Sequence, residues 1–233
     1  MSREIRLPLR YASTTLFEIG LSALHGKVPS PLAPVEVRPG VGLVSLTVIG
    51  VAADGVHGAH GALPGYDEAV FCVHVEPDLS EQVPDLSMLV LCFAATEPSA
   101  LVANADHHDL NVLPTPVRIT IDAEGHHTRV FDEAGPIAEV RCAHPRPVYV
   151  ERPATLQVYT HTPGGVRRYD ERFEARSFRH QKRARSATLH DHPFFCGVAV
   201  DRLERPFLQW LCAPSEPVLQ IATTPTRPVE DRP

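Results

Sequence analysis

The sequence predicts a mostly β fold with a few short helices, in which the strands form a barrel or a strongly curved antiparallel sheet. The first observation is the 23 prolines among 233 residues, which argue against long helices because each removes a backbone donor and crowds the preceding turn. The second is that short apolar runs rich in β-branched residues recur between proline and glycine turns. The third is that only residues 99–109 combine helix start signals with the length of a longer helix.

The first half of the chain is expected to hold the central strands. Residues 41–52 form a nearly continuous apolar run without the polar positions of a surface helix, so we interpret them as a central strand. Residues 68–76 alternate polar and apolar side chains, which places Glu68, His74 and Glu76 on one markedly polar face. The other elements expected here are strands over residues 10–19 and 86–94, a short helix near 21–27 and a flexible glycine-rich loop over 54–65.

The second half is expected to complete the sheet with short strands and hairpins. Residues 117–122 and 128–131 flank a turn-like segment, which is typical of a hairpin. Residues 169–189 are strongly polar and are expected to pair as a long exposed hairpin. Further elements are expected at residues 137–142, 156–161, 194–200 and 207–213. Because no internal repeat or linker is visible, we interpret residues 1–222 as one domain and residues 223–233 as a flexible tail.

The charge of the chain argues against a polyanionic partner. The formal net charge is -6, so no overall basic field favours nucleic acid. One basic run, residues 176–185, is interpreted as a solvated strand face or hairpin, with an anion-binding patch as the alternative.

The cysteines and the N-terminal segment indicate a cytoplasmic protein. The five cysteines are odd in number, widely spaced and mostly set in apolar runs, and none forms a C-x-x-C pair. That pattern is typical of reduced, buried thiols rather than of a disulfide framework or a zinc ribbon. The N-terminal residues have no apolar core of a signal peptide, and nowhere do 18 apolar residues follow one another. We therefore expect neither export nor a membrane partner.

Several strings, in this order along the chain, resemble the acetoacetate decarboxylase superfamily, a β-barrel-centred fold of small-molecule enzymes. Residues 22–32, S-A-L-H-G-K-V-P-S-P-L, are similar to the family's short helix that ends in V-P-x-P-L. Residues 65–75, G-Y-D-E-A-V-F-C-V-H-V, resemble its Y-x-E strand, and residues 109–116, D-L-N-V-L-P-T-P, resemble its E-L-x-x-Y-P-K-K segment. The resemblance covers residues 10–145, with a weaker similarity at residues 190–193, and implies an acetoacetate-decarboxylase-like fold with its site inside the sheet.

The resemblance also shows a departure, because the family's reactive lysine has no counterpart. Members with decarboxylase activity form a Schiff base through a lysine of the P-K-K string. That position falls on Thr115 or nearer Asn111, and neither side chain can form an imine. The only two lysines, Lys27 and Lys182, lie elsewhere in the sequence. We therefore expect a divergent member that does not decarboxylate acetoacetate through an imine.

Two glutamates carry further implications of the resemblance. Glu18 falls where the decarboxylases have a substrate-binding arginine, so a carboxylate substrate would be repelled there. Glu68 falls on a family active-site glutamate. A glutamate in a largely apolar interior has a raised pKa and can exchange a proton near neutral pH, and histidine does so without help.

The segment that follows the expected helix is predicted to face the same site. Adjacent histidines on a helix diverge by about 100°, so only one of His107 and His108 can face Glu68. We choose His108 because its neighbour Asp109 falls where the family has a glutamate; the alternative is a solvated polar cap of the helix. The predicted site has as catalytic residues Glu68, His74 and His108, and as substrate-binding residues Glu18, Glu76, Asp109, Asn111 and Thr115.

Metal binding is an alternative because the chain has 13 histidines. On a strand, His190 and His192 would share a face, and Glu68 could complete a two-histidine, one-carboxylate set. His57 and His60 are a second candidate pair, whereas His126 and His127 are interpreted as residues of a hairpin tip. The prediction nevertheless includes no metal.

The function predicted from these residues is a lysine-independent lyase or isomerase that acts on a small carbonyl compound, a keto acid or polyketide-like molecule, by general acid–base chemistry. The alternatives are a non-catalytic small-molecule binding protein on the same scaffold and a histidine-ligated metal enzyme. No motif of a serine hydrolase, P-loop NTPase or nicotinamide enzyme is present. We expect a small-molecule substrate, no cofactor, no nucleic-acid partner, and either a monomer or a homo-oligomer.

Overall fold

The computed structural model describes residues 4–53, 57–58, 61–62, 64–79, 83–108, 110–122, 127–141, 146–149, 153–174, 177–182, 186–200, 203, 206–212 and 218–222. The strands are β1 (Glu4–Gly20), β2 (Val41–Val51), β3 (His57–Gly58), β4 (Gly61–Ala62), β5 (Tyr66–His74), β6 (Leu86–Ala95), β7 (Arg118–Ile121), β8 (His127–Phe131), β9 (Pro136–Arg141), β10 (Arg146–Tyr149), β11 (Ala154–Thr162), β12 (Gly165–Glu174), β13 (Ser177–Lys182), β14 (Ser186–Leu189), β15 (Pro206–Cys212) and β16 (Val218–Ala222). The helices of this part of the chain are α1 (Pro98–His108) and the short 3-10 helices η1 (Leu21–Leu24) and η2 (Pro193–Phe195).

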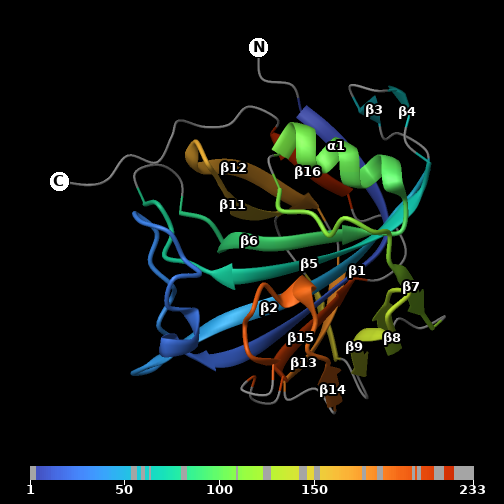
Figure 1. Cartoon of the computed structure of the whole chain (residues 1–233). Helices are drawn as coiled ribbons and strands as arrows, with labels where there is room; N and C mark the ends of the chain where they lie inside the picture. The colour runs from blue at the N-terminus through green and yellow to red at the C-terminus, as the bar shows by residue number, and fades with distance from the viewer. Residues whose placement is uncertain are drawn as a thin grey trace.

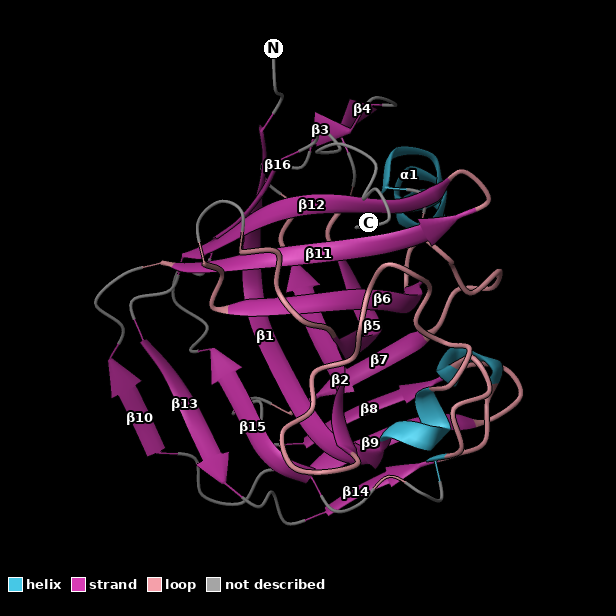
Figure 2. Cartoon of the chain, turned by 90° about the vertical axis from the view of Figure 1, so that its left-hand side faces the viewer, coloured by secondary structure: helices cyan, strands magenta, loops and turns pink. Residues whose placement is uncertain are grey.

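The large sheet turns around β1. Its ten strands follow the order β10-β13-β15-β1-β16-β12-β11-β6-β5-β2, and β1 also pairs with β2 (Figures 1 and 2). Residues 4–8 of β1 pair with β16, whereas its pairing with β2 begins at Leu9. The pairing of β2, at one end of the strand order, with β1 brings the sheet back on itself, and the described strands form a curved sheet rather than a closed barrel. The predicted mostly β fold is confirmed in its curved-sheet form.

Close packing between β1 and β2 depends on a glycine. A Cβ atom at Gly50 would lie 2.4 Å from the Tyr11 ring, which covers the backbone of β2 at this point. Gly50 stands opposite Tyr11, at an irregularity of the pairing that follows Leu9. Glycine is the residue that allows so close an approach. Gly50 therefore lies close to the point where the pairing of β1 changes from β16 to β2.

The sheet is mixed rather than wholly antiparallel. β11 pairs with β6 in the parallel direction, with Leu156 opposite Leu86 and Tyr159 opposite Leu89, whereas its other neighbour, β12, is antiparallel. Parallel neighbours need a long crossover between them. Here α1 and the strands β7, β8 and β9 lie within that crossover along the chain.

A second sheet covers the outer face of the large one. It has the order β14-β9-β8-β7 and lies beside the lower part of the large sheet in both cartoon views (Figures 1 and 2). The main hydrophobic core fills the space between them and includes Val44 and Phe71 of the large sheet with Ile137 and Val140 of β9. η2 closes this core, since the Phe195 ring stands edge-on to Phe71 with 5.0 Å between centroids.

α1 forms where the sequence predicts a helix and covers one end of the curved sheet (Figure 1). Pro98 fits its first turn, and the Glu97 carboxylate accepts from Ser99 Oγ at 3.0 Å. Ala100 and Leu101 are buried against a cluster that includes Tyr66 of β5, whereas Val102 is exposed. α1 therefore covers the end of β5 that carries Tyr66.

Three expectations need correction or fall wholly or partly outside the described residues. The long exposed hairpin over residues 169–189 is wrong: these residues belong to β12, β13 and β14, which pair with different strands, and Tyr169 is buried. In the predicted loop over residues 54–65, β3 and β4 pair with each other, and the rest of that loop except its last two residues lies outside the described part. The predicted tail, residues 223–233, lies wholly outside it.

None of the described helices has the length and apolar character needed to cross a membrane.

Candidate functional site

The inner face of the curved sheet is built by side-chain alternation along its strands. On β5, Glu68, Val70, Cys72 and His74 share this face, as the sequence pattern predicts. Glu68 stands between Ile49 of β2 and Ala95 of β6. Its side chain lies among apolar neighbours and is 6% exposed, so a carboxyl group here has lost most of its contact with water.

Burial sets the acidity of Glu68. It raises the pKa of the carboxyl from 4.5 to about 8, and the negative charge of Glu171 adds to the rise. The Tyr66 hydroxyl is hydrogen bonded to Glu68 and opposes the rise, while Asn104 of α1 is hydrogen bonded to Tyr66. Glu68 is therefore protonated at neutral pH and can donate a proton.

Glu171 is a second candidate site residue, which the sequence pattern did not indicate. It lies on β12, opposite Leu156 of β11 and Ile221 of β16, and burial raises its pKa to about 7. The missed signal was alternation: Tyr169, Glu171 and Phe173 share one face of β12, yet the surrounding charges made the segment look solvated. Two carboxyl groups with raised pKa values thus lie close enough for the charge of Glu171 to raise the pKa of Glu68 further.

His74 lies at the other end of the same face. It is six residues from Glu68 along β5, which corresponds to about 20 Å, so the two side chains do not exchange a proton directly. His74 is 4% exposed and its Nε2 has no hydrogen-bond partner among the described residues. Burial lowers its pKa to about 4, so the imidazole is neutral at physiological pH.

The predicted substrate-binding glutamates lie away from Glu68. Glu18 forms an ion pair with Arg38, with Arg38 Nη2 2.9 Å from Glu18 Oε2, so the acidic charge that we expected to repel a carboxylate is balanced by an arginine. Glu76 is exposed just beyond β5, where its backbone N–H donates to the Ala33 carbonyl at 2.8 Å. Neither residue is brought to the carboxyl pair.

The segment on which the resemblance puts the position of the reactive lysine is divided between two faces. Leu110 and Val112 pack on the inner side with Val70. Asn111 instead donates through Nδ2 to the Leu91 carbonyl at 2.7 Å, and Thr115 is exposed. The structure therefore does not bring Asn111 or Thr115 beside Glu68. The predictions for His107, His108 and Asp109 fall outside the described part of the chain, since the helix backbone is placed to His108 but these side chains are not.

Of the histidines considered as metal ligands, His192 has other contacts. His192 Nε2 lies 2.9 Å from Asp132 Oδ2, and its Nδ1 accepts from the Phe194 N–H, so both ring nitrogens hold η2 in place. Within the described residues, no group of three His, Cys, Asp or Glu side chains is arranged to hold a metal ion. The side chains of His57 and His60 are outside that part.

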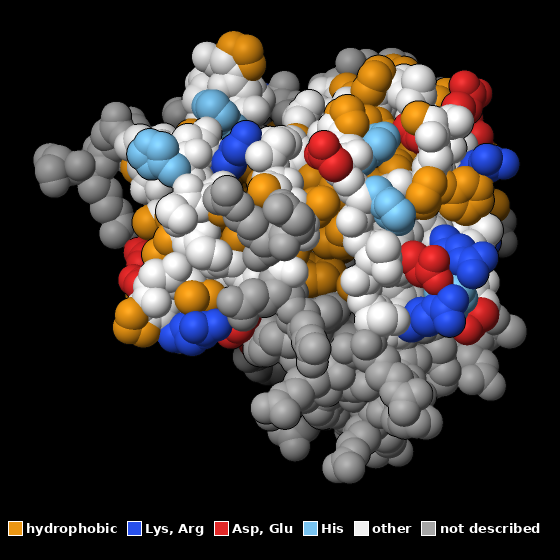
Figure 3. Space-filling view, turned by 60° about the horizontal axis from the view of Figure 1, so that its bottom comes forward, with side chains coloured by type: hydrophobic (Ala, Val, Ile, Leu, Met, Phe, Trp, Pro, Cys, Tyr) orange, Lys and Arg blue, Asp and Glu red, His pale blue; other side chains and the backbone are white. Residues whose placement is uncertain are grey.

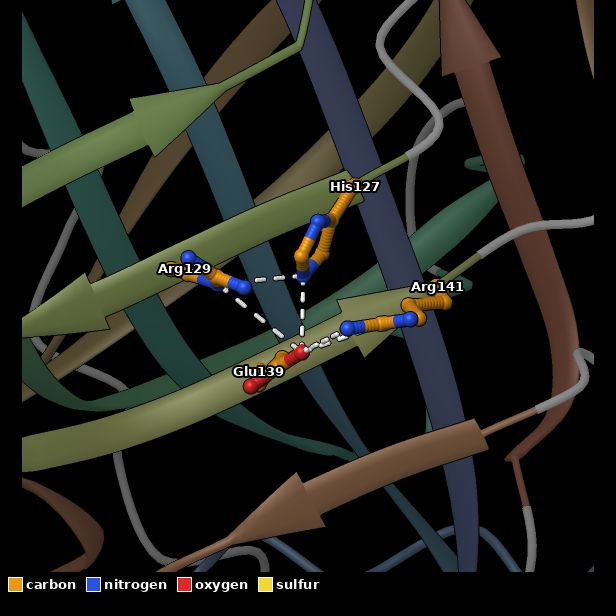
Figure 4. Close-up of polar contacts among 4 residues, drawn as sticks. All are labelled: His127, Arg129, Glu139 and Arg141. Carbon is orange, nitrogen blue, oxygen red and sulfur yellow. Dashed lines mark hydrogen bonds and ion pairs between the residues drawn. The ribbon is translucent and has the colours of Figure 1, made fainter.

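A second charged cluster lies on the outer face of the second sheet (Figure 4). His127 Nε2 and Arg141 Nη2 are each 2.8 Å from Glu139 Oε1, and Arg129 lies beside them. Hydrogen bonds from Arg141 and then from His127 hold the pKa of Glu139 below its usual value. On the face seen in Figure 3, acidic and basic side chains are interspersed rather than gathered by sign.

Comparisons with known proteins identify the fold. No family model matches the chain, and no curated protein does. The enduracididine biosynthesis enzyme MppR, complexed with pyruvate, superposes with a TM-score of 0.63 at 9% identity and covers 99% of this chain and 92% of that one. For acetoacetate decarboxylase from Legionella pneumophila the TM-score is 0.61 at 11% identity, with 95% and 85% covered. For an acetoacetate decarboxylase-like enzyme from Sphingomonas wittichii RW1 it is 0.60 at 8% identity, with 97% and 94% covered.

At these identities the likeness is one of fold. The chain has the acetoacetate decarboxylase-like fold, as the resemblance of its strings predicted, and it spans nearly the whole length of these structures. A fold hosts more than one chemistry, so the reaction has to be argued from the side chains of this chain.

Proposed function

We propose that the chain is an acetoacetate-decarboxylase-like enzyme that acts on a small carbonyl compound as a lyase or isomerase, by general acid–base catalysis without an imine. The observation that carries the proposal is the pair of carboxyl groups inside the sheet. Burial and mutual repulsion raise the pKa of Glu68 to about 8, and burial raises that of Glu171 to about 7. Perturbed carboxyl pairs of this kind are characteristic of acid–base sites.

The two pKa values divide the roles. At neutral pH Glu68 holds its proton and can donate it to a carbonyl oxygen, while Glu171 is ionised in a large fraction of molecules and can remove a proton from the adjacent carbon. Together the two transfers convert a ketone into its enol, with one proton gained and one lost. Tyr66 positions the acid through its hydrogen bond to Glu68. An enol is the intermediate that isomerisations and retro-aldol cleavages share.

The substrate class follows from the same features and from the neighbours. Near pH 7 Glu68 is mostly neutral and Glu171 is partly neutral. The pair therefore carries little negative charge, and a neutral or singly charged carbonyl compound suits it. The structural neighbour MppR was solved with pyruvate and with the condensation product of pyruvate and imidazole 4-carboxaldehyde. We therefore choose pyruvate as the first probe.

The second candidate is a binding protein without turnover. It is favoured by His74 Nε2 and Thr160 Oγ1, which are buried and have no partner among the described residues. Unpaired buried polar atoms lose stability, and a polar ligand that met them would recover it. This reading needs no chemistry from Glu68.

Deuterium exchange distinguishes the two candidates. An enolising enzyme accelerates the replacement of the pyruvate methyl hydrogens in D2O, which proton NMR follows directly. Glu68→Gln is expected to slow this exchange by about 100-fold or more, because a positioned acid or base contributes 10²–10⁴ to rate. Glu171→Gln is expected to have a similar effect, and Glu139→Gln, which changes the outer cluster, none.

Two results would count against the proposal. If pyruvate binds but its exchange is no faster than in buffer, and if a set of small ketones and aldehydes behaves alike, the binding protein is the better description. If borohydride with pyruvate leaves a stable adduct on Lys27 or Lys182, the chemistry proceeds through an imine. The expected result is exchange without an adduct.

A further inference from the structure

Cys196 occupies a constrained position at the end of η2, on a part of the molecule that the proposed acid–base site does not use. Its backbone has a φ of 53°, the left-handed conformation that is uncommon for residues other than glycine. The conformation is fixed by a hydrogen bond from its N–H to the Pro193 carbonyl at 2.9 Å and by the two contacts of His192 described above. Cys196 is partly exposed, whereas Cys72 and Cys92 are buried, so small reagents can reach this part of the surface.

The sulfur atom of Cys196 is surrounded by polar groups that come from distant parts of the sequence. Asn111 Nδ2 lies 3.4 Å from Sγ and donates to it, and Sγ lies 3.3 Å from the Leu91 carbonyl oxygen. The thiol of Cys92, on β6, forms a hydrogen bond with the Cys196 thiol. The two cysteines are thus neighbours although 104 positions separate them, since Cys92 directly follows Leu91, whose carbonyl oxygen lies beside Cys196 Sγ.

A cation completes the cluster. Lys27 Nζ donates to the Cys196 carbonyl at 2.7 Å, which holds its positive charge beside the thiol. The titratable groups that face Cys196 Sγ are Cys92 from β6 and Lys27 from the turn after η1. The hydrogen bond with Cys92, the charge of Lys27 and the amide of Asn111 together lower the pKa of the Cys196 thiol to about 7.

The other described thiols differ from Cys196. Cys72 is 1% exposed and burial raises its pKa, so it stays a thiol and is shielded from reagents. Cys92 is 3% exposed, and its hydrogen bond with Cys196 followed by burial raises its pKa. The arrangement therefore pairs one accessible, acidic thiol with one buried thiol that stays protonated.

We propose that Cys196 is a reactive thiol of this protein and that Cys92 is its resolving partner, so that a hydroperoxide converts the two into an intrachain disulfide. The redox-active pairs known from other proteins place a low-pKa, accessible thiol next to a second one in this way. The chemical class of the oxidant is a peroxide, inorganic or organic.

The reaction has two steps. The Cys196 thiolate attacks the terminal peroxide oxygen, the O–O bond breaks, and the leaving oxygen takes a proton from water to give water or an alcohol. Cys196 is thereby oxidised by two electrons to a sulfenic acid. The Cys92 sulfur then attacks the Cys196 sulfur, the S–O bond breaks, and the hydroxyl group leaves as water with the Cys92 proton. In sum, two thiols and one hydroperoxide give a disulfide, an alcohol or water, and one water.

The test uses the full wild-type chain, hydrogen peroxide and peptide mapping by mass spectrometry. After oxidation at pH 7, the expected product is a Cys92–Cys196 disulfide, with Cys72 still free. In a second measurement, alkylation of Cys196 by iodoacetamide at pH 6.5 should be about fivefold faster than that of a free cysteine, because its larger thiolate fraction outweighs its lower nucleophilicity.

Variants assign the parts of the cluster. Cys92→Ser should leave a sulfenic acid on Cys196 that dimedone traps, and Lys27→Gln should shift the pH midpoint of alkylation upward. Cys72→Ser is the matched control and should change neither result. Circular dichroism confirms that each variant is folded, and the wild-type mapping stands without any of them.

Three results would overturn the proposal. One is a disulfide in which Cys142 or Cys212 takes the place of Cys92. Another is oxidation of Cys196 to sulfinic acid while Cys92 remains free. The last is an alkylation rate of Cys196 no higher than that of Cys72.

Discussion

Glu68 and Glu139 carry the same carboxyl group in two regions of the molecule, and the two regions change its acidity in opposite directions. On the inner face of the large sheet, burial raises the pKa of Glu68 to about 8. On the outer face of the second sheet, hydrogen bonds from Arg141 and His127 lower that of Glu139 (Figure 4). The difference shows that the partners and the access of water, rather than the residue type, decide what a carboxyl group can do.

The partners of the two groups explain the contrast. Glu139 has three basic neighbours and keeps 33% of its side-chain surface exposed, so its charged form is favoured. Glu68 has a tyrosine, a second carboxyl and apolar side chains around it, so its neutral form is favoured. Both arrangements are polar clusters, but only the inner one holds a proton that can be exchanged near neutral pH.

The largest effect is expected from Glu68→Gln, measured as the pH dependence of stability. Because the folded-state pKa of Glu68 is raised from 4.5 to about 8, the folded chain holds this proton more tightly than the unfolded chain. The stability that proton binding contributes is complete below pH 4.5 and is lost as the pH rises toward 8. The loss over that range is on the order of 5 kcal/mol. Urea unfolding should show the variant more stable than wild type at pH 8.5 and no more stable at pH 4. Equal pH slopes in the two proteins would mean that Glu68 is ionised inside the fold.

A smaller effect of the opposite sign is expected from His74→Leu. The folded-state pKa of His74 is lowered from 6.5 to about 4. Between these two pH values, His74 is protonated in the unfolded chain and neutral in the folded chain. Wild-type stability is therefore complete above pH 6.5 and falls as the pH drops toward 4, by on the order of 3 kcal/mol. The variant should lose this acid-side decline in the same unfolding experiment, with its stability at pH 7.5 as the reference. An unchanged decline would locate the acid sensitivity elsewhere.

The smallest effect is expected from Glu139→Gln. The group is exposed, and surface ion pairs contribute little to stability. Because the pKa of Glu139 is lowered in the folded state, any contribution is present above pH 4.5 and disappears as the pH falls. Thermal unfolding at pH 7 should give a melting temperature within the repeat error of wild type. If the variant is clearly less stable than wild type at low salt and this difference disappears at high salt, the outer cluster acts as a connected network.

The sequence predicted the elements whose pattern is local. The apolar run over residues 41–52 is β2, which ends one residue earlier, and the predicted helix over 99–109 is α1, shifted by one residue at each end. The alternation of residues 68–76 placed Glu68 and His74 on one face, as the structure has them. In each case the chain neighbours alone determine which side a residue faces.

What the sequence did not predict depends on contacts between distant segments. The polar residues of 169–189 predict an exposed hairpin, yet β12 pairs with β11 and β16 within the large sheet, which places Glu171 on its inner face. Cys92 and Cys196 meet only because η2 packs against β6, and no motif spacing indicates such a pair. Similarly, Arg38, in the segment that joins β1 to β2, forms an ion pair with Glu18. The resemblance predicted only the acidic charge of Glu18 and not the arginine that neutralises it.

The division of β1 among several neighbours has a consequence for how the chain reaches this structure. β2 follows β1 closely, so these two strands can pair early, whereas Ser13 meets Leu211 of β15 and Leu7 meets Leu219 of β16. Contacts between such distant segments form slowly, because a long loop must close before they return any stability. Until then one edge of β1 is open to pairing with another chain. During synthesis on the ribosome, β1 therefore remains without these partners until β15 and β16 have been made. A molecular chaperone that shields strand edges has its clearest role in that interval.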